Sequence, residues 1–281
     1  MTTPLSTEAL VAFVHKVLSE GQLHYRDFAW RQTRDPYAIL LSEIMLQQTQ
    51  VARVSKYYDN WLKTFPSIDA LAATDTASVL EAWQGLGYNR RGLALKRLAD
   101  QVSAQRAGIL PESYEELLQL PGVGPATAAG VMAFAHNVSA AYLETNVRSV
   151  VLHEIYADSD EVCDREVMAV VKLAAEYVHT SSTIDARRWN YALLDYGAWL
   201  KKNHVNPSRR SKQHTRQSKF EGSFRQKRAQ LLRAILLAPD ISAAELAQHC
   251  KLEIEDVEQA LDALTREGFI EIADNRYRIK N

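Results

Sequence analysis

Glu43 is the residue whose surroundings most directly suggest chemistry. It lies in a predicted helix from Tyr37 to Leu46, with apolar residues on both sides in the sequence. Apolar surroundings raise the pKa of a carboxyl group, and a carboxyl group that stays protonated near neutral pH can act as a general acid. A glutamate on the solvent-facing side of a helix is the alternative.

A turn with two glycines, Leu120-Pro121-Gly122-Val123-Gly124, is the second feature that could bind or react. Glycines allow a tight turn, and Pro125 suits the first turn of the next helix. The uncovered N–H groups at that helix N-terminus would bind an anion, for which a phosphodiester is the natural candidate. An ordinary helix–helix turn is the alternative. About 20 residues later a second carboxylate follows, Glu144.

Two further segments have compositions suited to binding nucleic acid. The loop from Trp83 to Arg91 combines two glycines, Tyr88, Arg90 and Arg91, so it could lie against a phosphate backbone while Tyr88 stacks on a base. Residues 201–228 hold ten Lys or Arg against one acid, although the net charge of the whole chain is −1. Such a block indicates a solvated segment or an arm for a polyanion. Its candidate phosphate contacts are Arg209, Arg210, Lys212 and Arg216.

Helices must position most of these residues. Helical periodicity runs through the first 200 residues, and no strand-like alternation appears before residue 265. The chain is therefore predicted to be mainly α, with a helical domain over 1–202, a basic linker over 203–223 and a small domain over 224–281. Three helices and a β-hairpin in the last domain predict a winged-helix-like fold. Its third helix is acidic, which disfavours binding in a DNA groove.

Composition indicates which metal sites and which cellular compartment to expect. Two cysteines 87 positions apart and scattered histidines predict no zinc or iron–sulfur site, and no apolar run reaches transmembrane length. We expect a cytoplasmic, nucleoid-associated protein that binds no membrane. The helix from Ser6 is predicted to end at Gly21.

Four motifs in order carry a family resemblance: Ser42-Glu43-Ile44-Met45-Leu46-Gln47-Gln48-Thr49, Gly85-Leu86-Gly87-Tyr88, Leu120-Pro121-Gly122-Val123-Gly124 and Asp195-Tyr196-Gly197-Ala198. Over roughly residues 24–200 the sequence resembles the helix-hairpin-helix base-excision DNA glycosylases. It is closest to the adenine-DNA glycosylase branch and more distantly similar to endonuclease III. The resemblance implies a glycosylase domain of two helical lobes that grip DNA and flip one nucleotide into a pocket.

The resemblance also implies a role for each matching residue. Glu43 matches the carboxyl that protonates the departing base, Glu144 matches a catalytic aspartate, and Asn146 matches an asparagine that supports the carboxylates. Gln48 matches the wedge that fills the place of the flipped base, and Tyr88 matches a residue that intercalates beside the opposing base. The remaining matches are Trp30 and Arg31 at the pocket edge, Asp195 near the base, Ala126 in the pocket, and Gly122 and Gly124 in the phosphate anchor.

Four departures from the family pattern limit the transfer. Glu144 is one methylene longer than the aspartate it matches. Ala126 stands where endonuclease III-like enzymes have the Schiff-base lysine, so no lysine-dependent strand cleavage is expected. Lys201 stands where the first iron–sulfur cysteine would lie, and the other three cysteines are absent. The winged-helix-like domain replaces the domain that recognises oxidised guanine.

The first reading is a monofunctional DNA glycosylase that excises adenine or another damaged or mispaired base from double-stranded DNA. We expect it to act as a monomer without a cofactor, and the sequence leaves open whether a monovalent cation sits in the hairpin. The second reading is a lesion- or structure-sensing DNA-binding protein with impaired catalysis. A transcription regulator that uses the winged helix is the third. The sequence does not define the excised base, the opposite base or the competence of Glu144.

Overall fold

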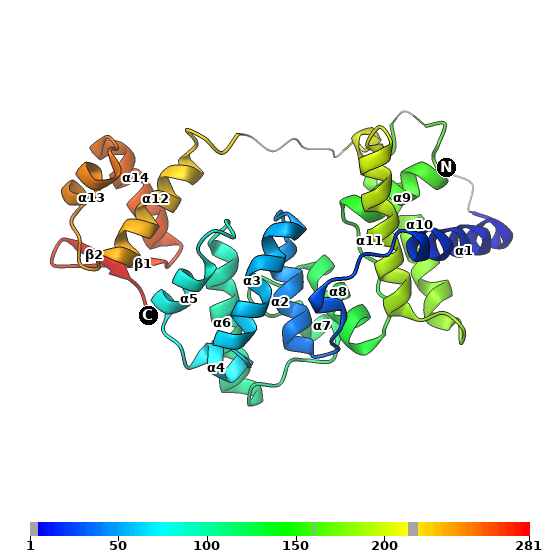
Figure 1. Ribbon diagram of the computed structural model, residues 1–281, viewed down its shortest axis with the longest axis horizontal. Coiled ribbons are helices and arrows are strands. Elements are labelled where there is room, and N and C mark those ends of the chain that lie inside the picture. Colours follow the sequence, from blue (N-terminus) through cyan, green and yellow to red (C-terminus); the bar gives the residue numbers. More distant parts are fainter. Residues whose placement is uncertain (1–4, 160, 213–218) are drawn as a thin grey trace. The chain divides into compact units, whose positions relative to one another are not determined.

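The computed structural model describes residues 5–159, 161–212 and 219–281 (Figure 1). Its described residues form two compact units. Unit 1 comprises the described residues within Met1–Gln47 and Leu110–Thr215, and unit 2 comprises those within Gln48–Ile109 and Arg216–Asn281. Arg216 and the rest of residues 213–218 lie outside the described part. No described helix combines the length and apolar character needed to cross a membrane.

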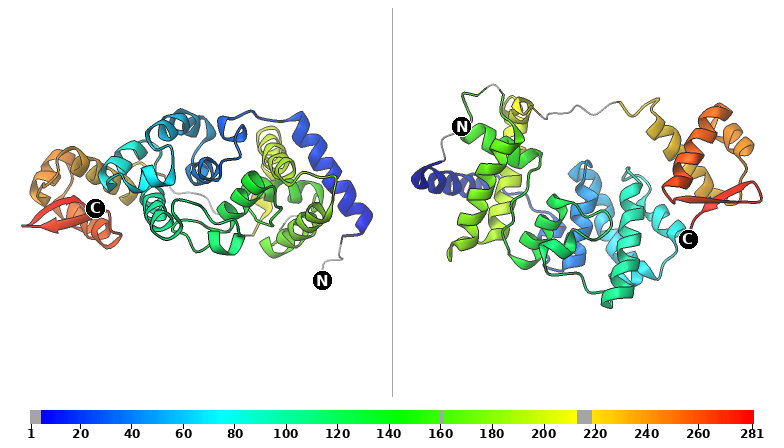
Figure 2. Two further views of the ribbon diagram at one scale, coloured as in Figure 1. Left: turned by 90° about the horizontal axis from the view of Figure 1, so that it is seen from below. Right: turned by 180° about the vertical axis from the view of Figure 1, so that it is seen from behind.

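Unit 1 is built around the long helix α11. Its described elements are α1 (Thr7–Leu23), η1 (Ala29–Arg31), α2 (Pro36–Leu46), α7 (Tyr114–Leu117), α8 (Pro125–His136), α9 (Thr145–Glu154), α10 (Asp164–Thr180), α11 (Ala186–Asn203) and η2 (Pro207–Arg210). Helices α1 and α9 both pack against α11 (Figure 2). Phe13 of α1 meets Trp189 of α11 edge to face, with ring centroids 6.2 Å apart.

Gly21 corrects one prediction about α1. The helix does not end there but continues to Leu23. A Cβ atom at Gly21 would collide with the Cα and Cβ atoms of Ala192. The glycine therefore allows α1 and α11 to approach closely, and it acts as a packing residue within the helix.

Unit 2 combines a second group of helices with the C-terminal residues. Its elements are α3 (Val51–Thr64), α4 (Ile68–Ala72), α5 (Thr76–Trp83), α6 (Arg90–Arg106), α12 (Phe224–Leu237), α13 (Ala243–Cys250), α14 (Ile254–Arg266), β1 (Ile270–Ala273) and β2 (Arg276–Ile279). The predicted β-hairpin is confirmed: β1 and β2 are antiparallel, with Ile270 opposite Ile279. Asp274 and Asn275 both have positive φ, as a two-residue hairpin turn requires. The mainly helical class is also confirmed, while the winged-helix assignment and the predicted domain boundaries stay predictions.

Part of the predicted basic linker is folded, so the alternative of a solvated segment is wrong for residues 207–211. Helix η2 packs against α9, and Pro207 and Ser208 are buried. Ser211 is buried as well and donates a hydrogen bond of 2.8 Å to Asp164. Residues 207–211 therefore belong to unit 1.

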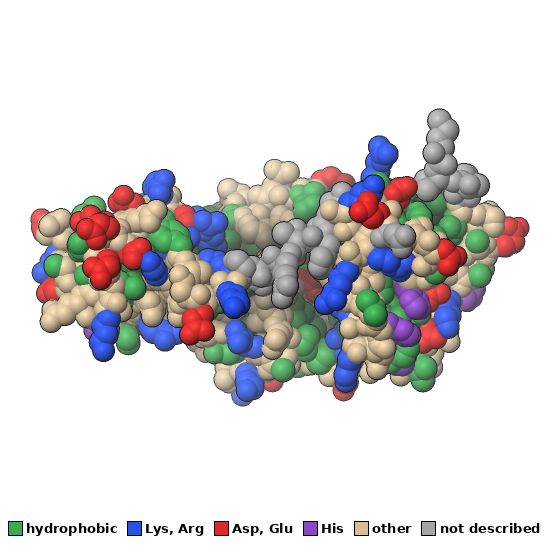
Figure 3. All heavy atoms as spheres, turned by 90° about the horizontal axis from the view of Figure 1, so that it is seen from above, with side chains coloured by type: hydrophobic (Ala, Val, Ile, Leu, Met, Phe, Trp, Pro, Cys, Tyr) green, Lys and Arg blue, Asp and Glu red, His purple; other side chains and the backbone are tan. Residues whose placement is uncertain are grey.

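Histidine side chains gather on one face of unit 1 (Figure 3). His24 stacks on Trp199 at 4.4 Å, and His204 lies 5.2 Å from the same indole and 5.3 Å from His153, measured between ring centroids. Within the described residues, no group of three or more His, Cys, Asp or Glu has the arrangement of a metal site. This cluster therefore contributes aromatic packing. The predicted lack of an iron–sulfur cluster still rests on the sequence alone.

Candidate active site

Glu43 lies on α2 and faces α8. Helix α2 begins at Pro36 because Asp35 caps it by accepting a hydrogen bond of 2.7 Å from the Ala38 N–H. A Cβ atom at Gly130 of α8 would lie 2.7 Å from the carboxyl carbon of Glu43, so glycine at this position leaves room for the carboxyl group where it now lies. Burial and the charge of Glu144 raise the pKa of Glu43 to about 8, although Arg31 acts in the opposite direction.

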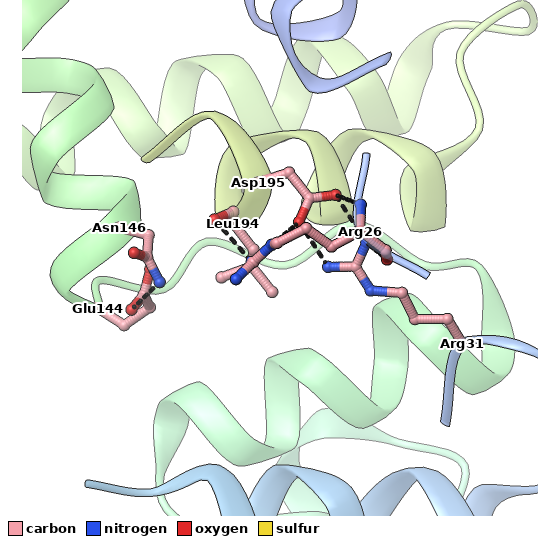
Figure 4. Close-up of polar contacts among 6 residues, drawn as sticks. All are labelled: Arg26, Arg31, Glu144, Asn146, Leu194 and Asp195. Carbon is pink, nitrogen blue, oxygen red and sulfur yellow. Dashed lines mark hydrogen bonds and ion pairs between the residues drawn. The ribbon is translucent and has the colours of Figure 1, made fainter. Parts of the chain in front are cut away.

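Glu144 is the N-cap of α9. Its Oε1 accepts a hydrogen bond of 2.8 Å from the Val147 N–H, and its Oε2 accepts one of 3.1 Å from Asn146 Nδ2 (Figure 4). Burial raises the pKa of Glu144, whereas the backbone N–H groups of Val147 and Asn146 and the charges of Lys201 and Arg148 oppose that rise. Glu144 thus has donors that favour the carboxylate, while no described residue donates a hydrogen bond to Glu43.

Asn146 is held in place by α11. A Cβ atom at Gly197 would lie 2.6 Å from the Cβ of Asn146, so Gly197 allows α9 and α11 to pack closely at this point. The amide nitrogen of Asn146 is used on Glu144, but its buried Oδ1 has no hydrogen-bond partner among the described residues. An unpaired buried acceptor beside a carboxylate is unfavourable unless water or a ligand satisfies it.

Asp195 and Arg31 form a buried ion pair. Arg31 binds both carboxylate oxygens of Asp195, at 2.6 and 2.8 Å, and Arg26 Nε binds one of them at 2.6 Å (Figure 4). The Asp195 side chain is 0% exposed and that of Arg31 only 3%. Asp195 thus lies in a buried ion pair, and its place near the base stays a prediction. It neutralises one of two arginines and orients Arg31 beside Glu43.

Aromatic rings complete this part of unit 1. Tyr191 stacks on Phe134 with ring centroids 4.1 Å apart, and the Arg31 guanidinium lies 4.2 Å from the centroid of its ring. Trp30 is buried and stacks on Phe28 at 4.9 Å. Trp30 and Arg31 are thus buried within the fold, and Arg31 also lines a surface cavity with Tyr25 and Tyr191.

The glycine turn joins α7 to α8 as predicted. Gly122 has a φ of +77°, which favours glycine, and Gly124 is the N-cap of α8 without a side-chain cap. The first N–H groups of a helix have no intrahelical acceptor, so those of α8 are available to an anion. A Cβ atom at Gly124 would meet nothing within 4 Å, so the approach is open. Ala126 lies in this first turn and is partly buried against the core.

Unit 2 carries Gln48 and Tyr88, which share an unusual backbone. Their φ angles are +55° and +51°, in the left-handed region that ordinary side chains rarely adopt. Strained positions of this kind are frequent at functional sites. Tyr88 is 37% exposed. Gln48 is exposed as well.

Arg90 and Arg91, predicted to bind DNA, both have partners inside unit 2. Arg91 is buried and donates to the carbonyl of Gly87 at 2.8 Å and to the hydroxyl of Thr49 at 2.9 Å. Arg90 Nε donates to Glu267 at 2.7 Å. These contacts shape the loop that presents Tyr88.

The candidate phosphate contacts at 209–212 differ from one another. Arg210 donates to four backbone carbonyls at and after the end of α9. Arg209 is exposed, and Lys212 is exposed beside Glu161, with 3.6 Å between the charged atoms. Arg210 is thus a structural residue, whereas Arg209 and Lys212 face solvent.

The sequence did not reveal several groups at the site. Gly130, Gly197 and Arg26 act through contacts between elements far apart in the chain. Lys201 is another such group: burial and Arg26 lower its pKa, while the Glu144 charge opposes this effect. Tyr142 is buried and lies close enough to both carboxyl groups for their charges, with burial, to raise its pKa. Only a glycine inside a helical pattern, as at 130 and 197, would have been a signal for close packing.

Comparisons with known proteins agree with this geometry. Residues 41–207 match the sequence model of the HhH-GPD superfamily base excision DNA repair proteins. The chain is 30% identical to an adenine DNA glycosylase of Mycobacterium tuberculosis, over 94% of this chain and 92% of the relative. It is 33% identical to an adenine DNA glycosylase of Buchnera aphidicola, but over only 61% of this chain and 47% of the relative. It also superposes on a thermostable thymine-DNA glycosylase with a TM-score of 0.60 and 30% identity, over 68% of this chain and 87% of that one.

Proposed function

Because the chain belongs to the HhH-GPD superfamily of base excision DNA repair proteins, we propose that it is a monofunctional DNA N-glycosylase. Its substrate is double-stranded DNA with a damaged or mispaired base, and adenine is the preferred base. The named relatives act on adenine and thymine, so both bases belong in the test.

One observation carries the proposal: burial raises the pKa of both Glu43 and Glu144, but only Glu144 accepts hydrogen bonds from described residues. Burial and the charge of Glu144 raise the pKa of Glu43 to about 8, which keeps it protonated at neutral pH. Glu144 accepts two hydrogen bonds that favour its charged form. A protonated and an ionised carboxyl group are what hydrolysis of a glycosidic bond requires.

In the proposed reaction, Glu43 gives its proton to a ring nitrogen of the base as the bond from C1′ to that base breaks. The Glu144 carboxylate stabilises the positive charge that develops on the sugar, and Asn146 fixes its orientation. Water then adds to C1′ and loses a proton to the Glu43 carboxylate, which restores the acid. Ala126 has no amine, so no Schiff base forms at that position and no strand cleavage follows there.

DNA is held by groups in both units. The α8 N-terminus with Gly122 and Gly124 binds a phosphate, while Gln48 fills the space of the flipped nucleotide and Tyr88 stacks beside the opposing base. The strained backbone at Gln48 and Tyr88 supports these roles. Residues 224–281 form a winged-helix-like domain, and the protein acts as a monomer without an iron–sulfur cluster.

The test is base release from a panel of duplexes that includes adenine opposite oxidised guanine and thymine opposite guanine. Glu43→Gln should retain duplex binding and lose base release by at least about 100-fold, the range for loss of a general acid. Alkali-sensitive abasic sites report the product. Equal rates for wild type and Glu43→Gln would refute the proposal. Binding without release by the wild type would favour the lesion-sensing alternative.

A further inference from the structure

Side chains of unit 2 hold the Tyr88 loop in place. Arg91 binds two carbonyls of the loop, those of Leu86 and Gly87, and the Trp83 indole N–H also donates to Gly87 at 3.1 Å. A Cβ atom at Gly85 would collide with the Tyr57 hydroxyl. The loop is thus a built structure rather than a free hairpin, and it holds Tyr88 in its left-handed conformation.

The C-terminal residues pack on the two helices that flank this loop. Leu80 of α5 and Leu93 of α6 are 1% and 5% exposed. Both belong to the same hydrophobic cluster as Leu231 of α12 and Leu264 of α14. Because α5 leads into the Tyr88 loop and α6 leads out of it, the C-terminal residues cover both ends of the loop with one core.

Glu267, just after α14, adds ion pairs and a hydrogen bond to the contact between the C-terminal residues and α6. Its carboxylate binds Arg90 at the start of α6 and Arg228 of α12. Its backbone carbonyl accepts a hydrogen bond of 2.9 Å from Arg97, which lies further along α6. A single exposed ion pair contributes little. Here one residue is held by three arginines, and its carboxylate is only 20% exposed.

A last contact reaches Tyr88 itself. Arg225 Nη1 lies 3.4 Å from the Tyr88 hydroxyl, and Arg225 Nη2 lies 3.4 Å from the carbonyl of Lys219. Both hydrogen bonds are long and therefore weak, so Arg225 does not fix the position of the Tyr88 ring. They place the start of α12 beside the ring that is proposed to enter DNA.

We infer that the C-terminal residues 224–281 brace the Tyr88 loop, with Glu267 as the positioning residue. The inference rests on the proposed role of Tyr88 in DNA. In this arrangement the acidic helix α14 does not read a DNA groove. Glu267, which follows this helix, holds Arg90 in place, so that the Tyr88 loop is already ordered when Tyr88 meets the strand opposite the target nucleotide.

The test compares Glu267→Gln with Glu271→Gln in the full chain. Glu271 is a matched control because it pairs with Arg278 at 2.7 Å inside the β-hairpin and touches no arginine of α6. Hydrogen exchange of residues 84–91 in the free protein should become faster in Glu267→Gln and stay unchanged in Glu271→Gln. Unchanged exchange in both variants would overturn the brace.

The second measurement uses a duplex that carries a stable abasic-site analogue opposite 2-aminopurine, whose fluorescence changes when Tyr88 inserts beside it. In the Glu267→Gln variant the loop becomes ordered only when DNA binds. The variant should therefore bind about tenfold more weakly and show a smaller fluorescence change. The double variant Tyr88→Ala/Glu267→Gln should bind no more weakly than Tyr88→Ala alone. Additive losses would instead show that the C-terminal residues bind DNA through their own surface, which would overturn the inference.

The two proposals fail in different ways. Wild-type protein that binds the abasic-site duplex but releases no base would refute only the glycosylase assignment. Wild-type protein that shows no preference for that duplex, with no fluorescence change, would refute the DNA role of Tyr88 and the brace together.

Discussion

Gly130 and Glu43 are in direct contact across the α2–α8 interface. A methyl group at Gly130 would lie 2.7 Å from the Glu43 carboxyl carbon, well inside van der Waals contact. The carboxyl group therefore occupies space that exists only because residue 130 has no side chain. This contact explains how an apolar helix face can accommodate a carboxyl group at all.

Gly130→Ala should consequently displace the Glu43 carboxyl and slow base release. A misplacement of about 1 Å can cost about 100-fold in rate. Single-turnover base release at saturating protein is the measurement, and DNA binding should be nearly unchanged because residue 130 lies inside the helix. Thermal melting separates displacement from unfolding. A folded Gly130→Ala protein with the wild-type rate would show that the carboxyl position is not critical.

The pH dependence of base release should follow the two carboxyl groups. Glu43 must be protonated to act, so the single-turnover rate should fall as the pH rises through about 8, the pKa of Glu43. Glu144 must be ionised, so the rate should also fall in acid, below the raised pKa of Glu144. The expected profile is bell-shaped. A rate that increases steadily through pH 8 would contradict the assignment of Glu43 as the acid.

Glu144→Gln separates the two roles of residue 144. The amide oxygen can still accept the Val147 N–H, so α9 keeps its N-cap and the free energy of unfolding should change by less than about 1 kcal/mol. The negative charge is removed, and base release should fall by about 100-fold or more. Calorimetry and single-turnover assays test the two halves. Normal release by Glu144→Gln would leave Glu144 as a helix cap only.

Much of this site could be predicted because its signals are local. Pro36 and Ser242 lie at helix starts, where a proline in the first turn and a serine cap are favoured. The apolar neighbours of Glu43 on its own helix are enough to indicate a raised pKa. The Asp274-Asn275 turn likewise defines the β-hairpin.

The remaining features depend on contacts that no local pattern encodes. Arg31 and Asp195 are 164 residues apart in the chain, so neither neighbourhood reveals that they neutralise each other. Gly21 resembles a helix end because the sequence does not show Ala192 beside it. The basic composition of 201–228 likewise hides the fact that residues 207–211 fold against α9.

The basic residues at 209–212 can be tested by comparing a variant of Arg210, whose side chain binds backbone carbonyls, with a variant of the exposed residues Arg209 and Lys212. Arg210 donates to the carbonyls of Leu152, Tyr156, Ala157 and Ser159 at 2.6–3.2 Å. Arg210→Ala leaves these acceptors without their donor, so the free energy of unfolding should fall by about 1–3 kcal/mol. The salt dependence of DNA binding should change little.

The exposed double variant Arg209→Ala/Lys212→Ala should behave in the opposite way. Its stability should stay near wild type, because the Lys212–Glu161 pair is exposed and long. The slope of log affinity against log salt should become shallower by about 0.9 for each phosphate that the variant no longer neutralises. Calorimetry and binding titrations at several salt concentrations compare the two variants. An unchanged slope in the double variant would show that Arg209 and Lys212 are solvated residues without a role in DNA binding.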